Sequence, residues 1–322
     1  MHQQLPKVEL HCHLDGIPHP SMLRRLEQND VRLPLSADAF AGFYPVQTFD
    51  DFVRWFQGVK PLEGNLDTFR PLLALHLERL KAENVVYTEI MIGGSEIPRD
   101  KSELVEKVRA FRDWVTKEEN GEIQVEFLVA FGRNRTPEQA EAIADRVLML
   151  HEARLVVGVV LAGPEQGHPV RPLHRTFARF REAGLGIEIH AGEWCGPESV
   201  WDALEYGFPD RIGHGIAIFQ DPNLLKRFQD DQIHIEMCPT SNLKTGSVRS
   251  IEDHPIQRAL ELGLSFSINT DDPGAFENTM ASEYRLLADV FGFTAADFDR
   301  VLHNSLAARF QKTLRGPALT QL

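Results

Sequence analysis

The sequence predicts an α/β fold, a (β/α)8 TIM barrel with a helical insertion after the first strand. Eight apolar runs rich in β-branched residues recur along the chain, and stretches with helical periodicity separate them. Strands that alternate with helices are typical of a parallel sheet closed into a barrel. The runs cover residues 8–14, 85–92, 123–132, 156–163, 185–190, 211–214, 233–237 and 264–269.

The stretches between the runs carry helix signals. Residues 137–151 begin with a proline after Thr136 and repeat apolar side chains at helical spacing. Thr294 with Asp297 predicts a capping box before the last helix, which runs through Leu306. The interval between the first two runs is the longest and holds several helical segments, which is why we expect an insertion there.

An apolar stripe lies in this insertion, at Phe49, Phe52, Val53 and Phe56. Core packing is the commoner origin of such helical spacing. The alternative is a lid over a pocket mouth, because a long insertion after a barrel strand emerges on the catalytic face.

Composition limits the classes of function. The 322 residues hold 34 basic and 47 acidic side chains, a net charge of −13, and no basic run, so we expect no nucleic-acid partner and a small neutral or cationic substrate. Cys12, Cys195 and Cys238 form no close pair, which favours a reducing compartment. The longest apolar stretch is too short to span a membrane, and the first residues lack an apolar targeting segment. We expect one domain over residues 1–322 in a cytoplasmic protein, and the oligomeric state stays open.

Two short motifs carry the chemistry. His11 and His13 are separated by Cys12 on a predicted strand, so their imidazoles point to the same side. His190 ends another run, and Glu193 follows within reach of whatever His190 holds. In a barrel the carboxyl ends of the strands converge on one mouth, so we expect these motifs to meet.

Imidazoles and a carboxylate suit Zn²⁺, although iron and other divalent metals also accept such ligands. We assign His11, His13, His190 and Asp271 as the ligands, while spacing alone allows Asp272 in place of Asp271. A bound metal lowers the pKa of water to about 7, which gives hydroxide at neutral pH.

Two further side chains complete the predicted chemistry. Glu193 would take the proton of the metal-bound water and pass it to the substrate. His214, between two glycines, would orient the hydroxide or stabilise the developing charge.

Each signal has a plainer interpretation when it is taken alone. A single histidine at a strand end is usually a satisfied polar residue, and Asp-Asp-Pro usually forms a turn. Cys12 and Cys238 are expected to be packed thiols, with Cys195 in a loop. The remaining histidines are expected at the surface, among them His19, His168, His174 and His254. The joint arrangement at one barrel face favours the metal site.

These motifs together resemble the adenosine/adenine deaminase family of the amidohydrolase superfamily, in order from about residue 5 to residue 310. The matching motifs are His11-Cys-His-Leu-Asp-Gly16, Leu161-Ala-Gly163, His190-Ala-Gly-Glu193, Arg211-Ile-Gly-His-Gly215, Cys238-Pro-Thr-Ser-Asn242 and Asn269-Thr-Asp-Asp-Pro273. The resemblance implies hydrolytic deamination of a 6-aminopurine such as adenosine or deoxyadenosine, with release of ammonia and one Zn²⁺ per chain. It selects Asp271 over Asp272 as the fourth ligand.

The resemblance also implies roles around the substrate. Glu193 would protonate purine N1 while hydroxide attacks C6, and His214 would position that hydroxide. Asp272 would contact N7, the Gly163 backbone would contact N3, and Asp15 would meet the ribose 5′-hydroxyl. The stripe would form an apolar gate, at Phe49, Phe52, Val53 and Phe56.

The group on purine N9 remains open at this stage. Adenine deaminases usually carry Glu where Asp15 stands, and the shorter acid favours a nucleoside. Ile17 and Pro164 depart from the family pattern on both sides of the expected pocket. The alternatives are free adenine, ribose, deoxyribose, or a modified sugar as in aminodeoxyfutalosine.

Two rival interpretations are weaker. Amidohydrolases with two metals often use a carboxylated lysine on strand four, and residues 156–163 contain no lysine or acid. A barrel that binds without catalysis would be expected to lack Glu193 or a metal ligand, and all are present.

Overall fold

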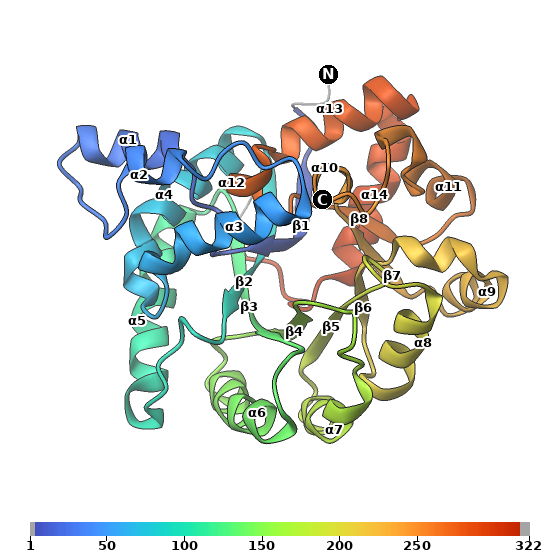
Figure 1. Ribbon diagram of the computed structural model, residues 1–322, viewed down its shortest axis with the longest axis horizontal. Coiled ribbons are helices and arrows are strands. Elements are labelled where there is room, and N and C mark those ends of the chain that lie inside the picture. The colour runs from blue at the N-terminus through green and yellow to red at the C-terminus, as the bar shows by residue number, and fades with distance from the viewer. Residues whose placement is uncertain (1–3, 316–322) are drawn as a thin grey trace.

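The computed structural model describes residues 4–315 and contains eight parallel strands paired in sequence order, which confirms the predicted (β/α)8 barrel (Figure 1). The predicted domain spans 1–322, so its first three and last seven residues lie outside the described part. The strands are β1 (Lys7–His13), β2 (Val85–Gly93), β3 (Gln124–Gly132), β4 (Gly158–Ala162), β5 (Gly186–Ala191), β6 (Arg211–His214), β7 (His234–Met237) and β8 (Phe266–Ile268). Each overlaps its predicted run, with bounds that differ by a few residues.

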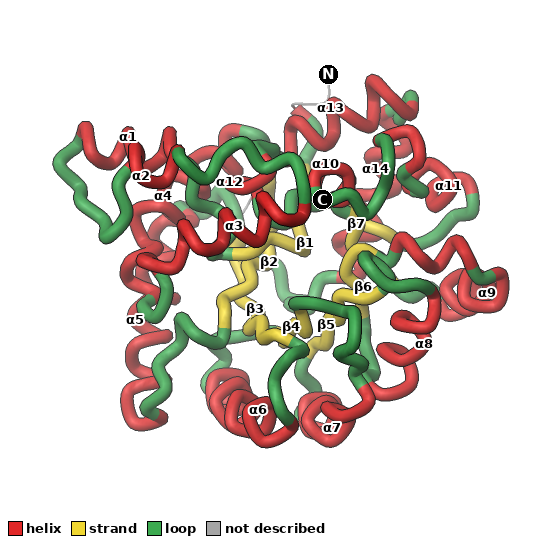
Figure 2. The backbone as a smooth tube through the Cα atoms, viewed as in Figure 1, coloured by secondary structure: helices red, strands yellow, loops and turns green. Residues whose placement is uncertain are grey.

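The strands are buried on both faces, which explains their nearly continuous apolar sequences. Helices surround the ring of strands in Figure 2. The α-helices are α1 (Pro20–Gln28), α2 (Ala37–Ala41), α3 (Phe49–Val59), α4 (Leu66–Ala82), α5 (Lys101–Glu119), α6 (Pro137–Glu152), α7 (His174–Glu182), α8 (Pro197–Tyr206), α9 (Pro222–Asp231), α10 (Pro239–Lys244), α11 (Ile256–Glu261), α12 (Pro273–Phe276), α13 (Met280–Phe291) and α14 (Ala295–Ala308). The short 3-10 helices are η2 (Lys60–Leu62), η3 (Arg171–Leu173), η4 (Ile216–Gln220) and η5 (Ile251–Asp253).

The capping box predicted before the last helix is confirmed, and the helix predicted after Thr136 begins with a capping box that was not predicted. The Thr136 side chain accepts from the Gln139 backbone N–H, and the Gln139 side chain accepts from the Thr136 N–H, at the start of α6. Thr294 and Asp297 form the same reciprocal pair before α14. Such pairs satisfy N–H groups that have no partner inside the helix.

The predicted insertion consists of α1, α2 and α3, and α3 crosses in front of β1 and β2 in Figure 1. Trp55 and Val59 bury one side of α3 against the rest of the insertion and barrel. Within residues 4–315, no helix is both long and apolar enough to cross a membrane.

The barrel closes where the segment after β8 meets β1. Asp271 forms an isolated parallel bridge with Cys12. The His13 N–H donates to the Asp271 carbonyl at 2.9 Å, and the Asp271 N–H donates to the His11 carbonyl at 3.1 Å. Closure of the ring therefore fixes Asp271 beside the two histidines of β1.

Candidate active site

Three histidines from opposite parts of the chain converge at the barrel mouth. His11 and His13 lie at the end of β1, and His190 lies on β5. One ring nitrogen from each lies within 4.8 Å of the others. The ring centroids of His11 and His190 are 4.6 Å apart, and those of His11 and His13 are 5.4 Å apart. The structure thus brings together the three imidazoles that the motifs singled out.

The geometry distinguishes the two neighbouring carboxylates. Asp271 Oδ1 lies 3.3 Å from His11 Nε2 and 3.4 Å from His13 Nε2. Its other oxygen accepts from Ser241 Oγ at 2.6 Å, so one carboxylate oxygen stays directed at the imidazoles. Asp272 lines the adjoining cavity, and its Oδ1 has no hydrogen-bond partner among the described residues. The arrangement favours Asp271 as the metal ligand.

The donor atoms fit a divalent metal. His11 Nε2 and His190 Nε2 are buried without a hydrogen-bond partner within residues 4–315. Burial lowers the pKa of His13 to about 4 and that of His190 well below its usual range, so both rings are neutral as metal ligands must be. Three imidazole nitrogens and a carboxylate oxygen make a ligand set typical of zinc.

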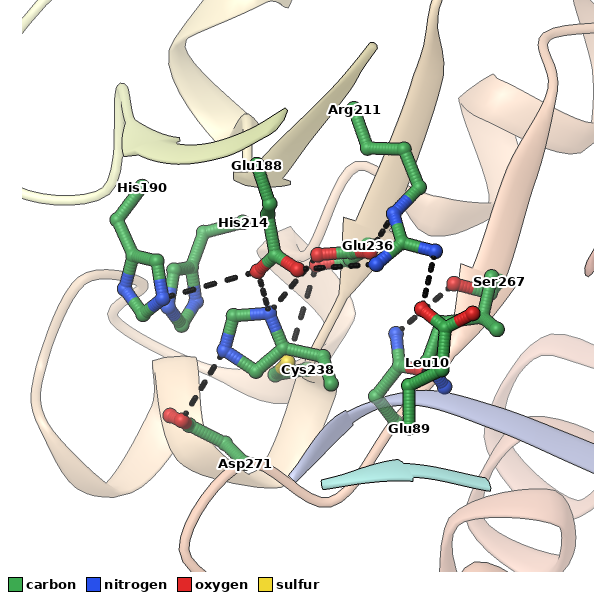
Figure 3. A network of polar contacts seen from close by, with 12 residues as sticks. Leu10, Glu89, Glu188, His190, Arg211, His214, Glu236, Cys238, Ser267 and Asp271 are labelled. Atoms are coloured by element: carbon green, nitrogen blue, oxygen red, sulfur yellow. Dashed lines mark hydrogen bonds and ion pairs between the residues drawn. The ribbon is translucent and has the colours of Figure 1, made fainter. Parts of the chain in front are cut away.

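A buried ionic network, which could not be read from the motifs, contacts Nδ1 of His11. Figure 3 shows its charged members Glu188, Glu236, Arg211 and Glu89. His11 Nδ1 lies 2.8 Å from Glu188 and 3.0 Å from Glu236, so Nδ1 carries the proton and Nε2 presents its lone pair to the site. Arg211 contacts both carboxylates and also Glu89. Carboxylates that orient a ligand histidine in this way raise its affinity for metal. Glu188 precedes His190 by two residues on the same strand face, a signal that the period-2 rule could have identified.

Glu193 and His214 form a second pair beside the imidazole cluster. Glu193 Oε2 lies 3.5 Å from His214 Nε2. Burial and the negative charge of Asp271 raise the pKa of Glu193 well above its usual range, so this carboxyl can carry a proton near neutral pH. His214 and Asp271 both have positive φ, 62° and 65°, a conformation that non-glycine residues adopt rarely and mostly at functional sites.

His254 is buried, so the prediction that it lies at the surface is wrong. Only 2% of its surface is exposed, because it follows η5, which packs against α10 and α13. Its Nε2 lies 3.2 Å from Asn242 Oδ1, and Asn242 Nδ2 lies 3.1 Å from His214 Nδ1. His254 and Asn242 therefore support His214. His19 and His168 are partly exposed and His174 is exposed, as expected. The same prediction is wrong for His76 and His234, which are buried.

A buried carboxylate holds the segment that carries Glu193, and the motif search missed it as well. Glu165 is 5% exposed and accepts through both oxygens. The donors are the backbone N–H groups of Gly192, Glu193, Trp194 and Cys195, at 2.5–3.1 Å, and Ser199 Oγ at 2.7 Å. Hydrogen bonds to a charged acceptor are the stronger kind, so Glu165 fixes the position of Glu193.

A cavity of about 1170 Å³ opens from the imidazole cluster. Every predicted substrate contact lines it, namely Asp15, Gly163, Asp272, Phe49, Phe52, Val53 and Phe56. The stripe therefore faces the cavity, as in the lid interpretation, and 42% of Phe49 and 45% of Val53 is exposed. Burial and the charge of Glu96 raise the pKa of Asp15 to about 7.

The cysteines lie as expected from the sequence. Cys12 and Cys238 are buried and Cys195 is partly exposed, and all three are free thiols. Cys12 also belongs to a second, buried group of side chains of metal-binding types, with Glu9 and His76.

A (β/α)8 barrel with clustered imidazoles and a carboxylate at its mouth is the arrangement of a barrel enzyme whose side chains can hold a catalytic metal. The sequence model of the adenosine deaminase family matches residues 6–320. The chain belongs to this family.

Similar proteins agree with this assignment. The adenine deaminase of Rhizobium leguminosarum bv. trifolii is 33% identical over 313 residues, which is 95% of each chain. The adenine deaminase of Sinorhizobium fredii is 32% identical over 96% of this chain and 95% of that one. Among solved structures, an adenine deaminase from Arthrobacter aurescens has a TM-score of 0.82 at 26% identity, over 95% of this chain and 94% of that chain. An amidohydrolase from Burkholderia ambifaria with bound Zn has a TM-score of 0.78 at 26% identity, over 96% and 86% of the two chains.

Proposed function

We propose that the protein catalyses zinc-dependent hydrolytic deamination of a 6-aminopurine. The overall reaction takes up one water, replaces the exocyclic amino group by a carbonyl and releases ammonia. The observation that carries the proposal is the approach of Asp271 Oδ1 to His11 and His13 beside a carboxyl, Glu193, whose pKa is raised. Family membership supports the same chemistry.

In this proposal His11, His13, His190 and Asp271 hold the metal. A bound zinc ion would supply a Lewis acid that lowers the pKa of a water molecule to about 7. Glu193 would donate a proton to N1 of the purine, because its raised pKa keeps a proton available at neutral pH.

His214 stands on the other side of the reacting carbon in this proposal. Burial lowers its pKa to about 3, so the ring is neutral and acts through a directed N–H rather than a full charge. Asp272 would donate to N7 of the purine, because burial and the charge of Asp271 hold its pKa well above its usual range and its buried Oδ1 lacks another partner among the described residues.

The relatives that are named adenine deaminases favour free adenine as the substrate. The preference for a nucleoside rests on Asp15 alone. The cavity volume favours a second candidate, a purine that is substituted at N9. Most small-molecule sites have volumes of about 300–1,000 Å³. At about 1170 Å³, this cavity has room for more than the purine base.

The test is ammonia release from adenine, adenosine, deoxyadenosine and aminodeoxyfutalosine, compared by kcat/KM. The same assay is run on Glu193→Gln. This variant should keep its metal and lose several orders of magnitude in kcat, because only proton transfer is removed. Near-normal turnover by Glu193→Gln would contradict the proposed role, and a metal-loaded protein that releases no ammonia from any of the four would contradict the function.

A further inference from the structure

The cavity has a wall of positive charge in addition to its acidic metal end. Three arginines line it, and we call them the arginine wall: Arg99, Arg135 and Arg146. Arg99 lies between β2 and α5, Arg135 between β3 and α6, and Arg146 on α6. Because β2 and β3 are neighbours in the barrel, these segments lie side by side at the mouth.

The arginine wall lacks counter-ions. The side chains of Arg99 and Arg135 make no hydrogen bond or ion pair with any described residue. The nearby Asp145 is already paired, with Lys101 at 2.9 Å and Arg179 at 2.7 Å. In a chain with a net charge of −13, this wall places two arginines without a counter-ion beside the cavity.

Arg146 holds the segment before Arg99 in place through hydrogen bonds to its backbone. Its Nη1 donates to the carbonyl oxygens of Gly94, Ile97 and Pro98 at 3.2–3.4 Å, which ties α6 to the segment that carries Arg99. Burial and the positive charge of Arg99 lower the pKa of Arg146, as expected of two neighbouring cations without an anion between them.

The chemistry of the substrate connects this wall with the metal end. C6 and N9 lie at opposite ends of a purine, so a base that presents C6 to the imidazoles directs its N9 substituent away from them, into the remaining cavity. Guanidinium groups bind phosphate and carboxylate with paired hydrogen bonds. We propose that the arginine wall binds an anionic group, a phosphate or a carboxylate, carried by the N9 substituent of the substrate.

This inference rests on the proposed deaminase function, and the experiment separates the two. The wild-type enzyme is assayed with two pairs of substrates that differ in charge: AMP against adenosine, and 5′-O-succinyladenosine against its methyl ester. The anionic member of at least one pair should have a kcat/KM about tenfold or more above its neutral partner, because charge-assisted hydrogen bonds are the stronger kind. The pair with the larger ratio identifies phosphate or carboxylate as the bound group.

Variants test whether the wall causes the preference. Arg99→Gln/Arg135→Gln should lower the anionic-to-neutral ratio about tenfold. Arg146 is left in place because it holds the segment. Arg109→Gln, which removes an exposed arginine of α5 outside the cavity lining, should leave the ratio unchanged. Raising the ionic strength should lower the wild-type ratio, a measurement that does not depend on the variants folding.

The outcomes are distinct. Deamination of adenosine with ratios of one or below in both pairs would overturn the anionic subsite and leave the deaminase function intact. A high wild-type ratio that the double variant preserves would overturn the assignment to Arg99 and Arg135. No ammonia from any compound, free adenine included, would instead contradict the proposed function.

Discussion

His254 Nε2 lies 3.2 Å from Asn242 Oδ1, and this contact determines which nitrogen of His214 carries its proton. His254 Nδ1 accepts from the Ile256 N–H at 3.3 Å, so Nε2 must be the donor to the amide oxygen. The amide nitrogen of Asn242 then donates to His214 Nδ1 at 3.1 Å. The neutral His214 ring is left with its proton on Nε2, the nitrogen that faces Glu193.

Removing this support should slow catalysis without removing the metal. In His254→Leu, Asn242 loses the partner that fixes its orientation, and kcat should fall about 10–100-fold, as is usual for residues that orient an active-site histidine. His254→Gln can both donate and accept, so it should recover much of the loss. Metal content and kcat are measured on both variants. Equal losses in the two, or loss of metal in His254→Leu, would argue for a general structural role.

The same histidine predicts a pH dependence of stability. Burial and the neighbouring His214 lower the pKa of His254 to about 3, whereas an unfolded histidine titrates near its usual 6.5. Between pH 6.5 and pH 3, the unfolded chain therefore binds a proton at this histidine and the folded chain does not. The contribution of His254 to stability is complete above pH 6.5 and is lost as the pH falls through this range.

His254→Gln lacks this titration, and the other buried histidines are common to both proteins. Below about pH 6, the unfolding free energy of the wild type should fall relative to that of His254→Gln by about 1.4 kcal/mol for each pH unit. Urea unfolding followed by tryptophan fluorescence at several pH values measures it. Parallel pH profiles for the two proteins would show that His254 is protonated in the folded state.

Glu165 should matter for catalysis through the segment it holds. In Glu165→Gln, an amide N–H₂ replaces one oxygen and faces backbone N–H groups, so at least one buried donor loses its acceptor. We expect a loss of about 1–3 kcal/mol in unfolding free energy. We also expect a lower kcat at unchanged metal content.

The matched control for this variant is Glu198→Gln. Glu198 is an exposed acid on the same segment and accepts from the Gly196 N–H at 3.0 Å. The Glu198→Gln substitution should leave kcat near the wild-type value. A Glu165→Gln variant that is destabilised but fully active would show that the segment does not need this clamp to position Glu193.

Gly16 is required by its close contact with Asp272. A Cβ at Gly16 would lie 2.1 Å from Asp272 Oδ1 and 2.7 Å from Asp272 Cα, so Gly16→Ala must displace that acid. We expect kcat/KM to fall about 100-fold, the usual effect of a shift near 1 Å in an active site. Gly42→Ala is the control, because its nearest atom, the Ala39 carbonyl oxygen, is 3.5 Å away. Similar kcat/KM values for the two alanine variants would rule out a tight requirement for the position of Asp272.

Strand positions and the imidazole cluster could be predicted from the sequence because local rules specify them. The alternation of side chains along β1 places His11 and His13 together, and barrel geometry brings His190 to the same mouth. Spacing could not choose between Asp271 and Asp272, because their difference arises from barrel closure at Cys12 and from the Ser241 hydroxyl.

Two of the supporting residues, Glu165 and His254, could not be predicted, because each acts across a long sequence separation. Glu165 meets the segment of Glu193 from the neighbouring strand's loop, and His254 reaches His214 only through Asn242. A histidine in a polar segment, between Asp253 and Pro255, carries no local sign of burial. Its burial follows from tertiary packing alone.

The most direct test of the metal site is X-ray diffraction from crystals of the protein at energies on both sides of the zinc absorption edge. We predict one anomalous peak about 2.0–2.2 Å from the four donor atoms, His11 Nε2, His13 Nε2, His190 Nε2 and Asp271 Oδ1. The absence of a peak among these atoms in zinc-loaded protein, or a peak at Glu9, Cys12 and His76 instead, would contradict the account.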